Sequence, residues 1–305
     1  MQQITENALI NLANRLYNET GSDNICLAGG VALNCVANGK IIPNTGFKNI
    51  FVQPAAHDAG TAIGAAYYIW NQILAETRVK PLKNVYLGPE YSEEEIRETL
   101  DKNGMNYKKV ENAEKHIALL ISQGNIIAWF DGKMEGGPRA LGNRSILADP
   151  RSPVIRDELN RKVKFREVFR PFCPCVLEQD AKEWFETDQY YDPAYYMLIA
   201  CMVKSDKADL IPSVTHVDKT ARIQLVTKET NERYFRLLSE FKKLTGVPVL
   251  LNTSFNIQEP IVCSPQDAVN TFRRSDMDCL VIGGYMIEKR EGDEWGERKV
   301  KSAAG

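Results

Sequence analysis

The spacing of apolar residues alternates along the chain between a helical period and short strand-like runs. In the first helix-like segment every fourth residue is apolar: Ile4, Ala8, Leu12 and Leu16. The run ICLAGG (25–30) ends in paired glycines, and NIFVQP (49–54) has the composition of a second strand. The small-residue-rich stretch TAIGAAYYIWNQILAE (61–76) predicts a long helix. The pattern therefore predicts an α/β arrangement in this part of the chain.

A connecting segment rich in proline and glycine follows, RVKPLKNVYLGPEYS (78–92), and places a domain boundary near residue 85. Ser92 and the acidic residues after it predict a helix N-terminus. Beyond it, helices are predicted at 92–104, 112–124, 154–163, 231–246 and 265–275, and strands at 125–132, 171–179, 195–203, 221–226, 247–252 and 279–284. This order predicts a mixed sheet with helices.

Composition and charge narrow the class of protein. A chain of 305 residues favours two domains, although one large α/β domain is also compatible with this length. No apolar run approaches the roughly 20 residues of a membrane helix, and the N-terminus lacks a secretory signal, so we expect a cytoplasmic protein without a membrane partner. The formal net charge of -2 argues against a nucleic-acid partner. Seven cysteines without C-x-x-C spacing predict reduced, mostly buried thiols, with Cys173 and Cys175 as strand residues.

Cationic side chains are concentrated in the middle of the chain. Residues 132–170 contain ten cationic and five acidic side chains, an excess of five positive charges. Several stand beside glycine or proline, as in PRALGNR (138–144) and FRPF (169–172). There the guanidinium groups of arginine can bind phosphate or carboxylate oxygens with two hydrogen bonds. An anion site is one interpretation, and a surface loop with solvated charges is the other.

Two further constellations are polar in an apolar context. In LLNTSFN (250–256) a buried strand runs into Asn252, Thr253, Ser254 and Asn256. These side chains line either a ligand crevice at a strand end or a simple turn. Arg222, within a strand-like run, either reaches a ligand phosphate or pairs with an acidic neighbour.

The first region offers weaker signals. Gly29 and Gly30 would let backbone amides approach a phosphate at a helix N-terminus. Asp58, next to His57, is either a metal ligand or the cap of the following helix, and the cap is the simpler interpretation. His116 and His216 have no histidine or carboxylate at ligand-like spacing, so we expect both to be structural or exposed.

Six motifs, taken in order, resemble the carbamoyltransferases of the nodulation-factor and antibiotic-modifying type: LAGGVALN, HDAGTAIGAA, GGPRALGNRSILADPR, VKFREVFRPF, TARIQLV and LLNTSFN. The resemblance implies part of an actin-like, sugar-kinase-fold transfer domain at 1–85. It implies at 86–305 a domain similar to threonylcarbamoyl-adenylate synthases, which forms carbamoyl adenylate from carbamoyl phosphate and ATP with magnesium. The carbamoyl group then passes at an iron site to a hydroxyl of a small-molecule acceptor.

The resemblance also implies roles for individual residues by motif position. Those expected to bind carbamoyl phosphate or the ATP phosphates are Arg139, Lys164 and Arg170. Those expected to hold nucleotide are Arg222, Asn252, Ser254 and Asn256, with Gly29, Gly30 and Asn34 facing the adenylate. Asp58 matches the family's aspartate ligand to iron.

The chain departs from the family pattern at its beginning. The His-x-x-x-His pair of iron ligands is missing, since histidines occur only at 57, 116 and 216. We therefore expect the latter half of a longer protein, with an apolar patch in the first region that favours self-association. Two alternatives remain open at this point: a threonylcarbamoyl-adenylate synthase-like enzyme and a non-catalytic nucleotide-binding module.

Overall fold

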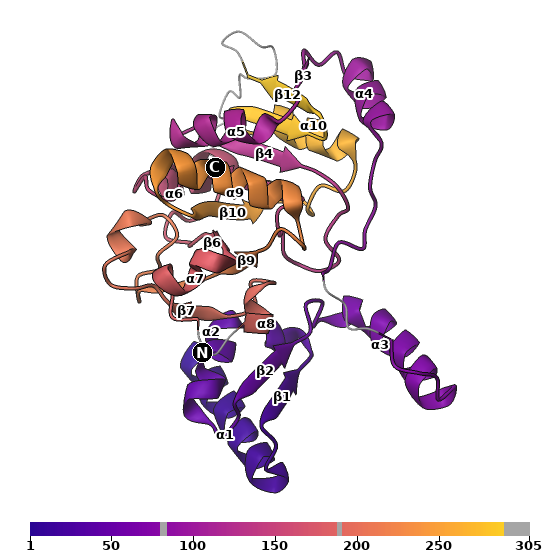
Figure 1. The fold of residues 1–305 in the computed structure, drawn as a ribbon, viewed down its shortest axis with the longest axis vertical. Coiled ribbons are helices and arrows are strands. Elements are labelled where there is room, and N and C mark those ends of the chain that lie inside the picture. Colours follow the sequence, from indigo (N-terminus) through magenta and orange to yellow (C-terminus); the bar gives the residue numbers. More distant parts are fainter. Residues whose placement is uncertain (80–83, 188–190, 290–305) are drawn as a thin grey trace, which may run out of the picture.

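A mixed sheet of eight strands forms the centre of the chain from residue 108 onward (Figure 1). The structure, a computed structural model, describes residues 1–79, 84–187 and 191–289. Along the sheet the strand order is β3-β12-β11-β4-β5-β10-β6-β9. Their bounds are β3 (Lys108–Lys109), β4 (Ile127–Phe130), β5 (Arg144–Ala148), β6 (Cys173–Leu177), β9 (Gln224–Val226), β10 (Val249–Ser254), β11 (Cys279–Ile282) and β12 (Tyr285–Glu288).

The direction of the strands is mixed, as the sequence predicts. The pairs β4–β11 and β6–β9 are parallel, and the remaining neighbours are antiparallel. The α/β class is thereby confirmed. Strands β5 and β12 were not predicted, because β5 follows directly on the glycine-rich segment and β12 on a two-residue turn.

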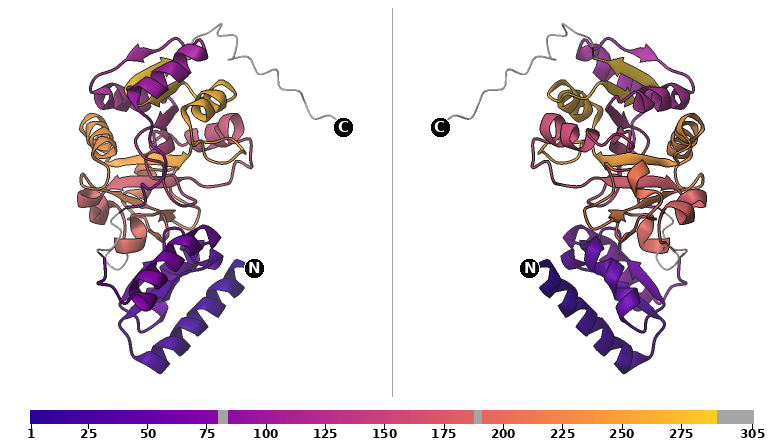
Figure 2. Two further views of the ribbon diagram at one scale, coloured as in Figure 1. Left: turned by 90° about the vertical axis from the view of Figure 1, so that its right-hand side faces the viewer. Right: turned by 90° about the vertical axis from the view of Figure 1, so that its left-hand side faces the viewer.

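Helices cover both faces of this sheet. Their bounds are α4 (Glu93–Lys102), α5 (Ala113–Ser122), α6 (Ile155–Glu158), η5 (Leu159–Val163), α7 (Glu178–Trp184), α8 (Tyr191–Ala194), η6 (Ala208–Leu210), α9 (Glu232–Thr245) and α10 (Pro265–Arg273). Helices α5 and α9 pack against each other, and Figure 2 shows α9 on one side of the sheet with α6 and α10 on the other. The predicted cap at Ser92 is confirmed: its hydroxyl accepts the N–H of Glu95, whose carboxylate returns the contact.

The first region is a small α/β unit around the parallel pair β1–β2. Its elements are α1 (Gln2–Thr20), β1 (Asn24–Leu27), η1 (Gly30–Leu33), α2 (Cys35–Ile41), η2 (Ile42–Asn44), β2 (Asn49–Val52), η3 (Asp58–Gly60), α3 (Thr61–Tyr68) and the π-helix η4 (Ile69–Ile73). The apolar stripe of α1 faces outward, with Ile4 and Leu12 exposed at 71% and 64%. The buried residues of α1 are instead Glu6 and Ala13, and the Glu6 carboxylate pairs with Lys40 at 2.6 Å.

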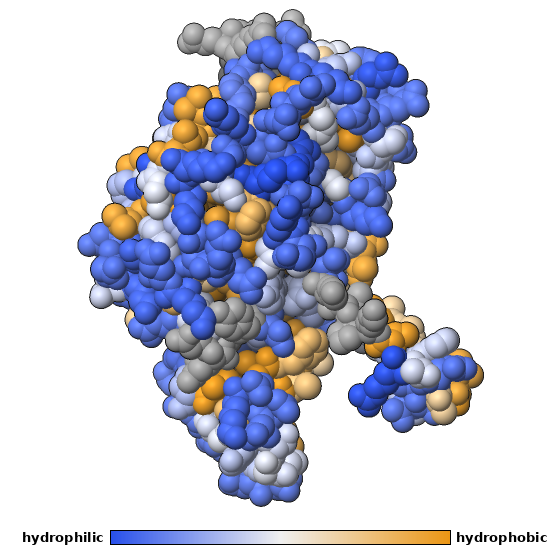
Figure 3. Space-filling view, in the orientation of Figure 1, coloured by the Kyte–Doolittle hydropathy of each residue, from blue (hydrophilic) through white to orange (hydrophobic). Residues whose placement is uncertain are grey.

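Helix α3 projects away from the rest of the chain and buries none of its residues (Figure 1). Large apolar side chains are exposed along it and along η4, including Tyr68, Trp70 and Ile73. Figure 3 shows apolar surface on this projection and on the lower part of the molecule. The expected exposure of apolar side chains in the first region is therefore observed.

A two-stranded antiparallel sheet, β7 (Ala200–Met202) and β8 (Thr220–Arg222), lies where the first region meets the large sheet. The predicted strands at 195–203 and 221–226 are thus shorter or broken, the second at Ile223. Helix α2 packs closely here, since a Cβ on Gly39 would lie 2.3 Å from the carbonyl oxygen of Ala200. The buried Asn38 amide also donates to the Leu198 carbonyl at 2.8 Å.

None of the helices in the described ranges combines the length and apolar character needed to cross a bilayer. The boundary near residue 85 stays a prediction. Close to this boundary, Tyr86 pairs with Glu135 in an isolated bridge, and the N–H of Gly136 donates to the carbonyl of Val85.

Candidate anion-binding site

The glycine-rich loop at 136–142 folds around one buried carboxylate. Oε1 of Glu135 accepts the N–H groups of Leu141 at 2.6 Å, Asn143 at 2.9 Å and Arg144 at 3.3 Å. Burial raises the pKa of this carboxyl, while the N–H groups of Leu141 and Asn143 and the charge of Arg144 work in the opposite direction. Glu135 thereby fixes the path of the loop that carries Arg139.

Gly142 is required by both conformation and space. Its φ of 106° lies in the region that favours glycine, and a Cβ there would lie 2.3 Å from Cδ1 of Tyr234. The loop can therefore close onto α9 only with glycine at this position.

Arg139 points from this loop toward the first region. Its Nη2 donates to the Leu33 carbonyl at 3.4 Å, and its Nε is buried without a hydrogen-bond partner among the described residues. Burial, and after it the charge of Arg222, lowers the pKa of this guanidinium. A buried donor with no partner beside a second cation is an unfavourable arrangement that a bound anion would relieve.

Arg144, the second arginine of PRALGNR and the first residue of β5, has a structural role. Nη1 of Arg144 donates to the carbonyls of Asp131 at 2.8 Å and Gly132 at 3.1 Å. Its guanidinium carbon lies 3.6 Å from the centroid of the Phe130 ring. Arg144 therefore closes the loop through backbone carbonyls. Arg139 is the residue of PRALGNR that faces the seam, the boundary where α2 of the first region meets β7 and β8.

Arg222 lies on β8 at the same seam and contacts a thiol. Its Nε donates to Sγ of Cys173 at 2.9 Å. Cys35, at the start of α2, is close enough for the charges of Arg222 and Arg139 to act on its pKa, yet burial, the largest effect, raises that pKa. Burial acts to lower the pKa of Arg222, but the thiols of Cys173 and Cys35 outweigh it, so that this pKa is raised. The sequence left open a pairing of Arg222 with an acidic side chain; among the described residues no carboxylate oxygen lies within 4.0 Å of it.

Arg166 is a cation that the sequence reasoning did not single out. Its Nε donates to Oδ1 of Asn160 at 2.7 Å, and its guanidinium carbon lies 4.9 Å from the Phe172 ring centroid. Burial lowers its pKa, followed by the charge of Arg170, and Arg222 acts in the same direction. The signal in the sequence was its place two residues after Lys164 in VKFR, but only folding brings it beside Arg222.

Lys164 is buried, with 4% of its surface exposed. Its Nζ donates to the Asn256 carbonyl and Oδ1, both at 2.8 Å, and to the Ser254 carbonyl at 2.5 Å. Burial lowers the pKa of this ammonium to about 7, and the charge of Arg166 adds to the effect. Ser254 and Asn256 therefore hold the lysine at the end of β10.

Arg170 lies at the exposed end of the loop at 164–170, which follows η5. Its Nη1 lies 3.9 Å from the Glu167 carboxylate, and 53% of its side chain is exposed. Its charge still acts on the pKa of Arg166. No hydrogen bond joins the predicted trio among the described residues: Arg139 faces the first region, Lys164 lies at the end of β10, and Arg170 is exposed.

Asn252 lies within β10, against the loop of Arg139. Its Nδ2 donates to Oε1 of Gln224 at 2.9 Å and to the Ala140 carbonyl at 3.2 Å. Gln224 in turn donates to the Leu141 carbonyl at 2.7 Å. Oδ1 of Asn252 is buried without a partner among the described residues. An unused acceptor here and an unused donor on Arg139 fit a ligand with both phosphate oxygens and N–H groups.

The predicted residues of the first region are engaged within the protein. The N–H of Gly29, at φ 98°, donates to the Ala56 carbonyl at 2.7 Å. Oδ1 of Asn34 caps α2 by accepting the N–H of Ala37 at 3.1 Å. Gly30 begins η1 and leaves open space where a side chain would be. Their predicted contact with adenylate stays a prediction.

The interpretation of Asp58 as a helix cap is wrong. The helix that follows, α3, has no side-chain cap. In the short η3 before it, Nδ1 of His57 accepts the N–H of Ala59 at 3.2 Å, and Asp58 is exposed in the first turn. Within the described ranges, no group of three or more histidine, cysteine or acidic side chains is placed to hold a metal ion. These residues alone do not fit the iron that the resemblance implies.

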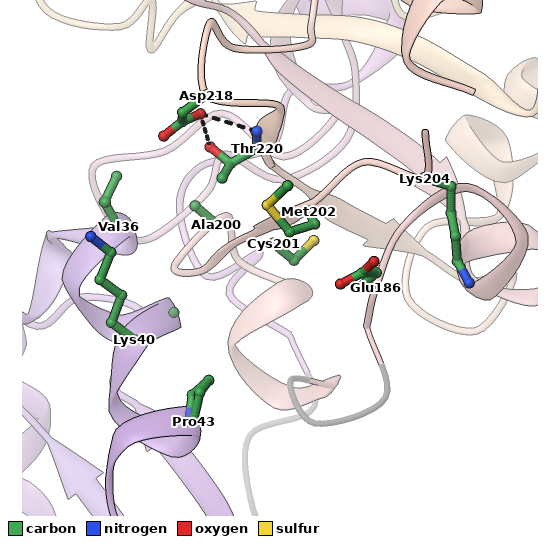
Figure 4. A pocket seen from close by; sticks show the side chains of 11 residues that line it. Val36, Lys40, Pro43, Glu186, Ala200, Cys201, Met202, Lys204, Asp218 and Thr220 are labelled. Atoms are coloured by element: carbon green, nitrogen blue, oxygen red, sulfur yellow. Dashed lines mark hydrogen bonds between the residues drawn. The ribbon is translucent and has the colours of Figure 1, made fainter. Parts of the chain in front are cut away.

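A cavity of about 600 Å³ lies where α2 meets β7 and β8 (Figure 4). It is lined by α2 and by β7 and β8, including Lys40, Met202 and Thr220. Thr220 and Arg222 lie two residues apart on β8 and so face the same side of the strand. Arg139, Arg166 and Arg222 themselves are not among its lining residues.

Two family models match the chain, and both describe carbamoyltransferases. The model of the carbamoyltransferase C-terminus matches residues 118–289, and that of the carbamoyltransferase N-terminus matches residues 1–67. Among solved structures, full-length HypF in a phosphate- and nucleotide-bound form aligns with a TM-score of 0.44 and 15% identity. That alignment covers 58% of this chain and 22% of HypF, too weak a similarity to carry weight.

Relatives of known sequence extend well beyond the matched part. The uncharacterized protein sll1178 of Synechocystis is 44% identical, over 97% of this chain and 54% of its own length. Nodulation protein NolNO of Sinorhizobium fredii is 43% identical, over 97% and 44%. Nodulation protein NolO of Bradyrhizobium diazoefficiens is 41% identical, over 95% and 54%. The chain thus spans about half the length of these relatives, and it belongs to the carbamoyltransferase family.

Proposed function

We propose that this protein forms carbamoyl adenylate from carbamoyl phosphate and ATP, as a step toward carbamoylation of a hydroxyl on a small-molecule acceptor. Residues 86–305 are the adenylate-forming part of this proposal, similar in fold to threonylcarbamoyl-adenylate synthases. Residues 1–85 belong to an actin-like transfer domain. The family membership supports carbamoyl transfer in general, and the cationic seam supports the chemistry of this particular step.

The proposed reaction has two balanced steps. Water cleaves carbamoyl phosphate to carbamate and inorganic phosphate. A carbamate oxygen then attacks the α-phosphorus of ATP, supplied as its magnesium complex, and the bond from that phosphorus to the bridging oxygen breaks. The electron pair leaves with pyrophosphate. The first step releases two anions and the second brings two anions together, so fixed cations are what the protein must provide, and no side-chain nucleophile is needed.

The observation that carries the proposal is that Arg139, Arg166 and Arg222 have no carboxylate partner among the described residues. Among the described residues none of the three has a carboxylate oxygen within 4.0 Å, and each acts electrostatically on at least one other. The charge of Arg222 disfavours the charged forms of Arg139 and Arg166 in the ligand-free protein. Phosphate and pyrophosphate groups are the ligands that turn this repulsion into binding energy.

Individual residues take roles within this proposal. Arg139, Arg166 and Arg222 bind the phosphates, while Arg170 at the loop edge guides anions toward the seam. Lys164, held by Ser254 and Asn256, adds a positive charge whose strength depends on pH. The unused Oδ1 of Asn252 accepts an N–H of the nucleotide or of carbamate.

Pyrophosphate release tests the proposal. The full chain is incubated with carbamoyl phosphate, ATP and magnesium, and pyrophosphate is measured with and without carbamoyl phosphate. We expect release that requires both substrates and is lost in Arg139→Gln. Release with threonine and bicarbonate in place of carbamoyl phosphate would instead identify a threonylcarbamoyl-adenylate synthase. Tight ATP binding without any release would identify a nucleotide-binding module.

A further inference from the structure

Asn160 is a wholly buried amide at the base of the loop that carries the cations of residues 164–170. Its Nδ2 donates to the carbonyls of Val168 at 3.1 Å and Arg170 at 2.9 Å. Its Oδ1 accepts Nε of Arg166 at 2.7 Å, and its own carbonyl accepts the Arg166 N–H at 3.0 Å. The Asn160 side chain therefore fixes the loop at Arg166, Val168 and Arg170.

The backbone between the two cationic side chains has a special conformation. Phe165 has a φ of 45°, in the left-handed region that non-glycine residues rarely adopt. This turn sends Lys164 toward the end of β10, while Arg166 faces Asn160 and Phe172. A residue in that conformation persists only where the surroundings determine it, and the contacts of Asn160 are the part of those surroundings that reaches across the loop.

The contact with Arg166 also decides which guanidinium atoms remain available. Asn160 occupies Nε, the donor nearest the backbone, and Phe172 covers a face of the group. Neither terminal nitrogen makes a hydrogen bond to the described residues, and the charge of Arg222 acts on this group. The two terminal nitrogens are the pair that can grip a phosphate with two parallel hydrogen bonds.

We propose that Asn160 is a positioning residue, which acts through Arg166 by holding its guanidinium toward the seam with both terminal nitrogens free for a phosphate group. The inference rests on the proposed function, because it assigns the same site. An amide is needed since only asparagine or glutamine offers two N–H donors and an uncharged acceptor at once. Aspartate would lose the donors and neutralise the guanidinium it is meant to present.

A double-mutant cycle on the full chain tests this role. Calorimetric titration with inorganic pyrophosphate, at fixed ionic strength, measures the affinity of the wild type, Asn160→Leu, Arg166→Gln and the double variant. We expect Asn160→Leu to weaken binding about tenfold in the wild-type background and less than about twofold with Arg166→Gln. A role that is only structural would weaken binding equally in both backgrounds, and that result, or full wild-type affinity of Asn160→Leu, would overturn the inference.

Asn160→Ser serves as the second variant if leucine prevents folding, and the melting temperature monitors both. Asn103→Ala is the matched control, because it loses amide contacts to Thr99 and Gln266 away from the cations and should keep wild-type affinity. Wild-type protein that binds neither pyrophosphate nor ATP overturns the proposed function together with the inference. Coupled binding energies without pyrophosphate release overturn only the enzymatic step.

Discussion

Arg222 donates from Nε to the Sγ of Cys173 over 2.9 Å, a contact with a thiol where a buried arginine ordinarily meets a carboxylate. Its positive charge also lowers the pKa of Arg139, after the larger effect of burial. Two guanidinium groups from separate parts of the chain thus face one seam without an acidic partner among the described residues. Such an arrangement favours anion binding.

Replacing either arginine should therefore weaken anion binding, and replacing Arg139 should do so without lowering stability. We predict that Arg139→Gln and Arg222→Gln each weaken pyrophosphate affinity by about tenfold or more. At low salt Arg139→Gln should leave the melting temperature of the ligand-free protein unchanged or higher, because the pKa of Arg139 is lowered by burial and by the charge of Arg222. Titration calorimetry and thermal melts measure the two effects. Arg97→Gln, at an exposed arginine paired with Glu94, is the control, and unaltered affinity in both seam variants would refute the prediction.

Lys164 should make stability depend on pH above neutrality. In the fold its pKa is lowered to about 7 from 10.5, so between these values the unfolded chain binds more protons than the folded one. The free energy of unfolding therefore gains from this residue as pH rises from about 7 toward 10.5, by at most about 1.4 kcal/mol per pH unit. The carbonyl contacts of Nζ favour the ammonium, so they oppose the lowering of this pKa and narrow the pH range of the effect.

Urea denaturation of wild type and Lys164→Met at pH 7 and pH 9 measures this dependence. The difference between the two proteins should shift in favour of the wild type at the higher pH. Lys162→Met is the matched control, since Lys162 is exposed and pairs with Glu158. An identical pH dependence in wild type and Lys164→Met would show that Lys164 keeps an ordinary pKa.

Gly142→Ala should destabilise the protein more than conformation alone explains. The new Cβ would collide with the ring of Tyr234, which is fully buried and cannot move aside. We expect a loss of about 3 kcal/mol or more in the free energy of unfolding, from the positive φ together with overpacking. Gly124→Ala separates the two causes, because Gly124 has a φ of 93° with nothing within 4 Å of its Cβ, and should cost only about 1 kcal/mol. Equal losses in the two variants would contradict the steric argument.

Glu135 should prove to be a support of the loop. Glu135→Ala leaves three backbone N–H groups without their acceptor, and we expect a loss of about 3 kcal/mol in the free energy of unfolding. Glu135→Gln retains an acceptor oxygen and should lose less. Chemical denaturation measures both, with Glu98→Ala on the exposed face of α4 as control. A variant Glu135→Ala with wild-type stability would rule out this role.

The exposed apolar side chains of the first region predict self-association of the chain. Ile4, Leu12, Tyr68 and Ile73 are each more than half exposed, at 71%, 64%, 61% and 63%. Sedimentation velocity should show a mass that increases with concentration, and a double substitution Ile4→Gln and Ile73→Gln should reduce the increase. A strict monomer at all concentrations would contradict the prediction.

Several features were determined by local sequence. The serine before three glutamates dictated the N-terminus of α4, because a capping box needs only neighbouring residues. The long apolar runs gave buried strands such as β4 and β11, whose periodicity is local as well. The ordered motifs were sufficient to indicate the carbamoyltransferase family, since they fix residue types at fixed spacing.

The tertiary structure decided which charges meet. Arg139 and Arg144 stand five residues apart in one glycine-rich segment, yet one faces the seam and the other binds backbone carbonyls. The charge of Arg222, from a distant strand, acts on the pKa of Arg166, whose guanidinium is held by Asn160. Sequence alone determined that cations and flexible backbone occur together. Only the packing of α2, β8 and the two loops set the distances between those cations, and electrostatic energy depends on distance.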